Sequence, residues 1–417
     1  MHDTATQADR VGPVPGSQRI VALDVLRGVA VLGILGTNIQ HFAMFAGTVR
    51  NPTLYGNLDG ANFWVYALTH IFVYQKFLPI FAMLFGAGLL LAAERREAAG
   101  IDPSALHYRR MTVLLFIGLF HAYLIWYGDI LVAYALCGML VFQFRRVSAR
   151  WLIVLGIALL AASPVIRVLF FILPGILGGG GGSTAIEQVV ADDLEAFRGP
   201  WVEQFRTRAA YVLEGQTTGF AVVLFWRASG LMAIGMGLYK LGVLTGRRSV
   251  RFYTTLAGLS LGVAVPLTVL GLTACVLTDW DHYGFWFLSD QIIYWFGIVM
   301  SLAWISIVML ACREGCRSWV GRSLAAVGRL ALTNYLLQSL TCTLVFYGHG
   351  LGLYGSVERT GQVAIVAGLW AFQLIVSPLW LRYFRFGPAE WLWRSLAYGR
   401  PQSFMIRPEV PTSPTAA

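Results

Sequence analysis

The chain has 417 residues, of which 57% are hydrophobic and only 12% are charged. About a quarter of the residues in a soluble domain are charged, so this composition excludes a soluble globular protein, a disordered chain, a coiled coil and a secreted disulfide scaffold. The net charge of +10 does not indicate nucleic-acid binding, because the Lys and Arg residues fall in short groups between apolar stretches, as in loops that face anionic lipid. The class of protein that remains is a membrane protein with several transmembrane spans.

Ten apolar stretches approach the length of about 20 residues that a helix needs to cross a bilayer. Residues 1–18 precede them as a polar leader that contains Pro and Gly but no cleavage-site pattern, and we expect it to be disordered. Residues 19–400 are expected to form a single transmembrane helical domain of class all-α, and residues 401–417 a disordered cytoplasmic tail. The predicted spans are 25–46, 74–93, 110–127, 129–144, 151–173, 219–240, 252–277, 290–312, 327–347 and 362–382.

The basic residues in the connections predict the orientation of these spans. One set of alternate connections, with the two ends of the chain, carries 22 Lys or Arg residues, whereas the opposite set carries five: Arg50, Arg198, Arg206, Arg208 and Arg359. Basic residues accumulate on the cytoplasmic side of membrane proteins. We therefore expect both termini in the cytoplasm and a location in a bacterial cytoplasmic membrane.

The longest connection, residues 174–218, falls on the outer side by this rule. It begins with the glycine run from Gly178 to Gly182, which has no phosphate-binding spacing. Its second half mixes apolar and acidic residues, a pattern that fits either an interfacial helix over the membrane or a mobile acidic linker.

The cysteines show neither a disulfide framework nor metal-ligand spacing, and no metal is predicted. All five are expected to be unreactive core residues: Cys137, Cys275, Cys312, Cys316 and Cys342.

Ionisable residues inside spans are costly and therefore mark candidate sites. His121 lies in the third span, and Asp129 follows where the chain must reverse. Such a reversal can bring the carboxylate to the imidazole, fix its tautomer and raise its basicity, as a general base requires. A buried histidine bonded to a neighbouring helix is the structural alternative, and His41 near the outer end of the first span is a reserve candidate.

Other polar residues in the spans are candidates for substrate binding. Asp24 and Arg27 share a helical face at the inner boundary, where Arg27 can bind a phosphate or serve as a membrane anchor. Asn334 and Gln338 also share a face, and they can bind substrate or hold helices together. Asn38, Lys76 and Arg227 complete the set, with Arg227 deep enough to require a carboxylate, an amide or a bound anion.

Five ordered strings resemble the YeiB-like family, the domain of unknown function 418, over nearly the whole chain. They are RIVALDVLRGVAVLGILGTN from Arg19 to Asn38, KFLPIFAMLFGAG from Lys76 to Gly88, HAYLIWYGDIL from His121 to Leu131, GRLALTNYLLQS from Gly328 to Ser339, and WLRYFRFGPAEWLWR from Trp380 to Arg394. The opening LDxLRG pattern is in turn similar to that of the wider set of transmembrane acyltransferases.

That wider resemblance implies about ten spans and transfer of an acyl group from cytoplasmic acyl-CoA to an acceptor on the far side. It maps the leading Asp and Arg of those enzymes onto Asp24 and Arg27. Many of them carry a histidine eleven residues after the arginine, where this chain has Asn38. An amide cannot accept a proton at neutral pH, so an acyltransferase reading requires another base, for which His121 is the best candidate.

The working hypothesis is an acyltransferase in which Arg27 and the inner basic loops attract the CoA phosphates and His121, oriented by Asp129, deprotonates a hydroxyl or amine of a small-molecule, glycan or lipid acceptor. Asn38, Asn334 or Arg227 are the candidates to stabilise the oxyanion. A transporter or permease with a polar pathway, and a membrane scaffold without chemistry, are the alternatives.

Overall fold

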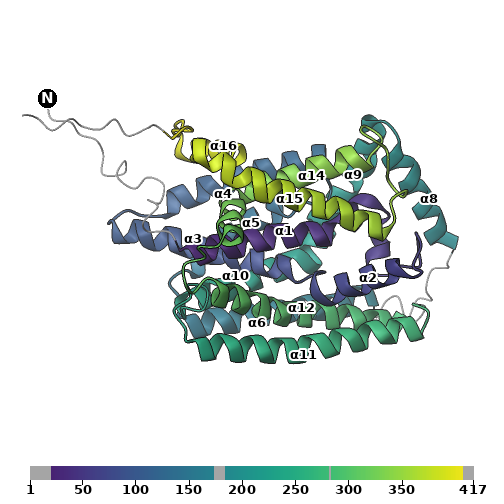
Figure 1. Cartoon of the computed structure of the whole chain (residues 1–417), viewed down its shortest axis with the longest axis horizontal. Coiled ribbons are helices and arrows are strands. Elements are labelled where there is room, and N and C mark those ends of the chain that lie inside the picture. The colour runs from purple at the N-terminus through teal and green to yellow at the C-terminus, as the bar shows by residue number, and fades with distance from the viewer. Residues whose placement is uncertain (1–19, 173–183, 281–282, 407–417) are drawn as a thin grey trace, which may run out of the picture.

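The computed structural model describes residues 20–172, 184–280 and 283–406, which form an elongated bundle of helices (Figure 1). The first half comprises α1 (Val21–Ala43), η3 (Ala46–Val49), α2 (Ala61–Phe72), α3 (Phe77–Ala98), α4 (Ser104–Phe120), η4 (His121–Ile125), α5 (Leu131–Val141), η5 (Phe142–Phe144), α6 (Ala149–Arg167) and η6 (Val168–Ile172), where η marks 3-10 or π-helical segments. The second half comprises α8 (Thr184–Arg198), α9 (Trp201–Glu214), η7 (Gly215–Leu224), α10 (Phe225–Lys240), α11 (Val250–Leu277), α12 (Tyr283–Ala311), α13 (Trp319–Arg329), α14 (Ala331–Phe346), α15 (Arg359–Tyr383) and α16 (Pro388–Tyr398).

Within these ranges eight helical stretches are long and apolar enough to cross a membrane, which confirms an all-α polytopic membrane protein. The predicted spans 129–144 and 327–347 are shorter helices, Leu131–Phe144 and α14, and α14 has only 16 residues. The second stretch, Ala61–Ala98, begins earlier than the sequence predicts because α2 leads into α3 through a break at Gln75, where φ is +63°.

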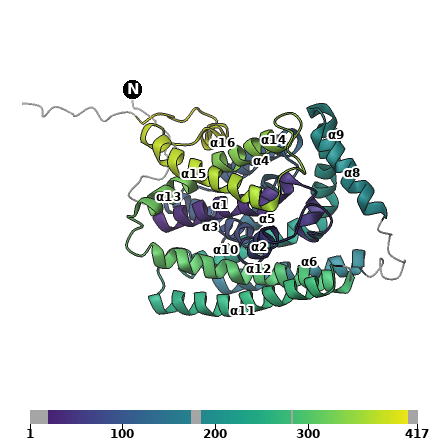
Figure 2. The ribbon, with the colours of Figure 1, turned by 45° about the vertical axis from the view of Figure 1, so that its right-hand side comes forward.

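Helix α1 occupies the centre of the bundle and packs against α3, α13, α14 and α15. On one side α3 packs against α10, which in turn packs against α6. Helices α11 and α12 form a pair at one edge of the molecule, and α14, α15 and α16 lie toward the opposite edge (Figure 2). The apolar side chains of α1, α3 and α10 meet in the largest buried cluster.

Glycines allow the central helices to approach closely. A Cβ on Gly28 of α1 would lie 2.0 Å from the carbonyl oxygen of Leu324 in α13, and one on Gly328 would lie 1.9 Å from the carbonyl oxygen of Asp24. A similar reciprocal contact joins α3 to α10, because a Cβ on Gly86 would lie 2.1 Å from the carbonyl oxygen of Met232 in α10. Small residues permit such backbone contact between membrane helices.

The second half of the 174–218 connection is helical and lies at one end of the bundle. It forms α8 and α9, and α9 runs on through η7 into α10 (Figure 1). Arg198 at the end of α8 donates from Nε to the carbonyl of Tyr354 at 2.7 Å, so α8 is tied to the loop between α14 and α15. The run Gly178–Gly182 and the leader 1–18 lie outside the described residues.

The first residues of the predicted disordered tail are held in place. Residue 405 forms an antiparallel bridge with Phe384, and the indole of Trp391 donates to the carbonyl of Gln402 at 2.8 Å. This contact follows from the reversal after α16, where Gly399 has a φ of +67°. Residues 407–417 lie outside the described part of the chain.

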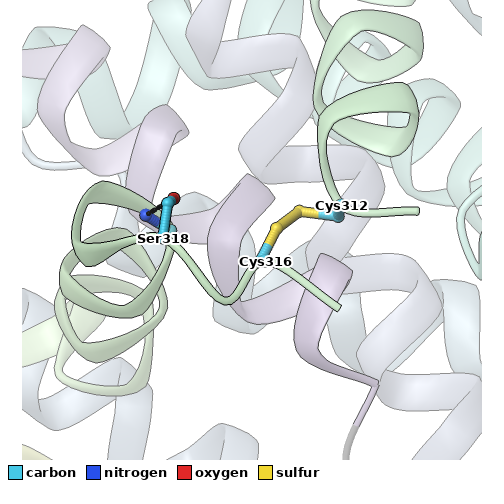
Figure 3. Close-up of a disulfide and its surroundings, with 4 residues drawn as sticks. Cys312, Cys316 and Ser318 are labelled. Atoms are coloured by element: carbon cyan, nitrogen blue, oxygen red, sulfur yellow. Dashed lines mark hydrogen bonds between the residues drawn. A yellow bond between two sulfur atoms is a disulfide. The ribbon is translucent and has the colours of Figure 1, made fainter. Parts of the chain in front are cut away.

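The expectation of five free cysteines is wrong for two of them. Cys312 and Cys316 form a disulfide, with their Cα atoms 4.5 Å apart (Figure 3). Cys312 follows α12, and positive φ angles at Gly315 and Cys316 fold the turn back on the helix end. Cys137, Cys275 and Cys342 are buried and take no part in this disulfide.

Candidate active site

His121 and Asp129 meet as the sequence predicts. The Nδ1 atom of His121 lies 2.8 Å from Oδ1 of Asp129, and their side chains are 0% and 1% exposed. Because the carboxylate accepts from Nδ1–H, the other ring nitrogen, Nε2, is left as the basic atom. Nε2 has no hydrogen-bond partner among the described residues.

The local backbone explains how the pair forms. Helix α4 ends in the π-helical turn η4, which starts at His121, and the amide of Trp126 donates to the carbonyl of His121 at 2.9 Å. The chain then reverses, and Oδ2 of Asp129 accepts from the amide of Val132 at 2.8 Å, which satisfies an otherwise unpaired donor at the start of α5. Asp129 therefore joins the helix start to the imidazole.

Aromatic side chains enclose the imidazole. The ring of Tyr335 in α14 lies 5.1 Å from that of His121, and Trp126, stacked on Phe42 of α1, lies on another side. This apolar enclosure strengthens the interaction between the carboxylate and the imidazole.

A first cavity of about 350 Å³ is lined by residues of α1, α3, α4, α5, α13, α14 and α16. Its apolar part contains Phe81, Phe85 and Leu114, and Tyr134 and Tyr335 also line it. Six arginines line it as well: Arg27, Arg95, Arg96, Arg110, Arg329 and Arg394. Arginine binds phosphates through paired N–H donors, so the cavity is suited to a ligand that combines phosphates with an apolar arm.

Glu390 of α16 is the one carboxylate among the described residues that line this cavity. Its Oε1 accepts from the amides of Leu332 and Thr333 at 2.7 and 3.0 Å, and Oε2 accepts from the Thr333 hydroxyl. Glu390 thus completes the N-terminus of α14 from another helix. Burial raises the pKa of the Glu390 carboxyl, although these hydrogen bonds oppose the rise.

A second cavity, of about 250 Å³, is lined by Asn38, Tyr127 and Asp129, and by residues of α9 and η7. It shares Ile34, Ile130 and Tyr335 with the first cavity, so the two cavities are neighbours at these three residues. His121 lines neither cavity and lies behind Tyr335.

The predicted inner pair also forms. Arg27 donates from Nη1 to Oδ1 of Asp24 at 3.1 Å, and Arg27 lines the first cavity with 31% of its side chain exposed. Of the other residues predicted to bind substrate, only Asn38 lines either of these two cavities.

Asn334 and Gln338 hold helices together, which is the structural role that the sequence leaves open for them. Asn334 donates to Val327 and Ser377 at 3.2 Å each, and Gln338 donates to the side chain of Gln373 at 2.9 Å. These bonds join α14 to α13 and α15, and neither amide lines a cavity. We do not retain them as substrate-binding residues.

His41, Lys76 and Arg227 are not among the residues that line the two cavities. The carbonyl of His41 accepts from the Tyr127 hydroxyl at 3.1 Å, but its imidazole lines no cavity. Lys76 and Arg227 belong to a separate polar cluster near α12.

Sequence reasoning missed Tyr335, Glu390 and most of the arginines around the first cavity. Tyr335 lies within the GRLALTNYLLQS string and Glu390 within WLRYFRFGPAEWLWR, so both motifs contained the signal. The sequence predicts that Arg27 and the inner basic loops attract phosphates, but it does not show which other arginines gather around one cavity. Within the described ranges no group of three or more His, Cys, Asp or Glu side chains could hold a metal ion.

Comparisons with known proteins agree with these motifs. Residues 238–400 match the family model described as "Protein of unknown function (DUF418)". The chain is 32% identical to the uncharacterized protein YeiB of Escherichia coli (strain K12) over 383 residues, covering 91% of this chain and 96% of YeiB. It is 31% identical to the uncharacterized protein YxaH of Bacillus subtilis (strain 168), covering 93% and 96% of the two chains. The chain therefore belongs to the YeiB-like DUF418 family of membrane proteins.

Proposed function

We propose that this protein is a membrane-embedded acyltransferase that takes an acyl group from acyl-CoA and passes it to a hydroxyl or amine acceptor. One observation carries the proposal: a buried His121–Asp129 pair lies beside two cavities that share Ile34, Ile130 and Tyr335. A transferase for two different substrates needs this arrangement, with a base between a donor site and an acceptor site.

The first cavity is the donor site in this proposal. Its arginines bind the CoA phosphates, and its apolar part receives the pantetheine arm and the acyl group. Both termini and the arginine-lined end face the cytoplasm, where acyl-CoA is available, and the acceptor enters through the second cavity. The similarity of the LDxLRG pattern to transmembrane acyltransferases supports the same direction.

The reaction begins when Nε2 of His121 removes the proton from the acceptor O–H or N–H. The acceptor atom then attacks the thioester carbonyl, and the C–S bond breaks. The imidazolium returns the proton to the leaving thiolate, giving CoA and the ester or amide. Asp129 holds Nδ1–H throughout and stabilises the imidazolium. Asn38 and Tyr335, which line the cavities, are donors for the oxyanion, and Tyr335 must move to expose His121.

Binding of the donor can be tested by thermal unfolding of the purified protein in detergent. Acetyl-CoA, longer acyl-CoAs and free CoA should each raise Tm, because a ligand that binds only the folded state stabilises it. Arg27→Gln should weaken this response. Arg251→Gln, which removes an exposed arginine of α11, is the matched control and should leave it intact. No rise in Tm with any of the three ligands would contradict the donor site.

Transport is the second candidate, because two neighbouring cavities that share three lining residues also resemble a path closed between two access states. A transporter should move a substrate across vesicles without covalent change and release no CoA. Detection of an acylated product by mass spectrometry separates the two functions.

A further inference from the structure

A second group of charges, buried or half-buried, lies between α3, α10 and α12, apart from the His121–Asp129 pair. Lys76, at the start of α3, is 0% exposed. Its Nζ donates to the carbonyl of His70, and no other hydrogen bond of this ammonium is found among the described residues. An ammonium has three N–H donors, so most of its donor capacity faces the protein interior unused.

Arg227 of α10 also has a hydrogen-bond donor without a partner. Its guanidinium lies 4.9 Å from the centre of the Tyr294 ring of α12, and its buried Nη2 has no hydrogen-bond partner in the described part of the chain. It forms no ion pair with a described carboxylate. Arg227 is also close enough to Lys76 for the two positive charges to repel each other.

The nearby carboxylate is already engaged. Asp290 of α12 forms an ion pair with Arg50 at 3.6 Å through one oxygen and with Arg167 through the other. Asp290 also attracts Arg227 electrostatically, but this single carboxylate is shared by three arginines, so the group that includes Lys76 keeps an excess of positive charge. Burying a cation without a counter-charge costs several kcal/mol, and the cost is highest inside a membrane protein.

We propose that Lys76 and Arg227 together bind a small monovalent anion, a halide or a short carboxylate. The ammonium and the guanidinium supply the charge, and Nη2 supplies a free donor at a fixed position. The Tyr294 ring holds the guanidinium from one side. Because neither residue lines the two cavities, the anion is distinct from the phosphates of an acyl donor.

The location suggests a connection with the second cavity. Leu224, one turn before Arg227 on the same continuous helix, lines that cavity, as does Phe220. The anion site is therefore one helical turn from the proposed acceptor site. The proposal does not depend on acyl transfer, and it holds equally if the protein is a transporter.

The test compares anions at constant ionic strength. The purified full-length protein is held in sodium gluconate, whose anion is large, and bromide, chloride or acetate is exchanged for it while Tm is measured. Wild type should show a saturable rise in Tm with at least one small anion, and the anion that saturates at the lowest concentration identifies the class. Lys76→Met and Arg227→Gln should each abolish the saturable rise, whereas Arg251→Gln should retain it.

The baseline distinguishes loss of a binding site from loss of the fold. In gluconate, Lys76→Met should unfold at the same temperature as wild type or higher, because it removes an uncompensated charge from the interior. Equal responses in wild type and in both variants would overturn the proposal, since they would reflect general salt effects. A wild type that does not respond to any small anion would overturn it as well.

Discussion

At the scale of single residues, Glu390 shows how one buried carboxylate connects α16 to α14. Because the folded state raises its pKa, the folded protein binds this proton more tightly than the unfolded chain does. Its contribution to stability is therefore complete below the ordinary glutamate pKa of about 4.3 and is lost as the pH rises through the raised value.

Glu390→Gln removes this titration while it keeps an oxygen for the amides of Leu332 and Thr333. The difference in Tm, variant minus wild type, should therefore increase as the pH rises from about 4 to 8. Thermal unfolding in detergent at a series of pH values measures it, with the exposed Glu314→Gln as a control for simple loss of a carboxylate. A difference that falls with pH would contradict the assignment.

Residue identities predicted the His121–Asp129 contact because both groups are ionisable, lie in an apolar region and flank a chain reversal. They did not predict Tyr335 beside His121, since the approach of α14 depends on contacts between helices far apart in the sequence. For the same reason the sequence left two readings open for Asn334 and Gln338, and only the packing of α13, α14 and α15 shows their partners.

At the scale of helices, close backbone contact explains why some helix positions require glycine and others do not. A Cβ on Gly235 of α10 would lie 2.0 Å from the carbonyl oxygen of Met83 in α3, whereas one on Gly258 of α11 would meet nothing within 4 Å. Both glycines lie inside helices. They therefore share their secondary structure and differ only in what surrounds them.

Gly235→Ala should therefore destabilise the protein by about 1–3 kcal/mol, the usual cost of an overpacked core. Gly258→Ala should be neutral or stabilise it by up to about 1 kcal/mol, because alanine is the better helix former. Denaturant or thermal unfolding of the two variants in the same detergent checks the contrast. A similar loss of stability in both would show that the α3–α10 contact does not set the effect.

Helix existence followed well from hydropathy, and helix length did not. A window of about 20 apolar residues identifies a span, but it does not show that α14 begins only at Ala331, after α13, or that α2 precedes α3. The Cys312–Cys316 disulfide was missed for a related reason, because positive φ angles in a turn cannot be read from the cysteine spacing alone.

For the whole molecule, the central claim is that one base operates between two cavities. The arginine-lined cavity and the Asn38 cavity share three lining residues, and the His121–Asp129 pair lies beside them. Topology alone predicted where the arginines gather along the membrane normal. It could not predict that six of them line one cavity, because that depends on the association of α1, α3, α4, α13 and α16.

The most direct test measures CoA release and acylated product when the purified protein is supplied with acetyl-CoA and membrane extract as the source of acceptors. Wild type should transfer the acyl group, and His121→Gln should reduce the rate by about 10²–10⁴-fold, the usual contribution of a general base, while the acyl-CoA-dependent rise in Tm is retained. Asp129→Asn should reduce it as well, because the imidazole loses its orienting carboxylate. Transfer at the wild-type rate by His121→Gln would contradict the account.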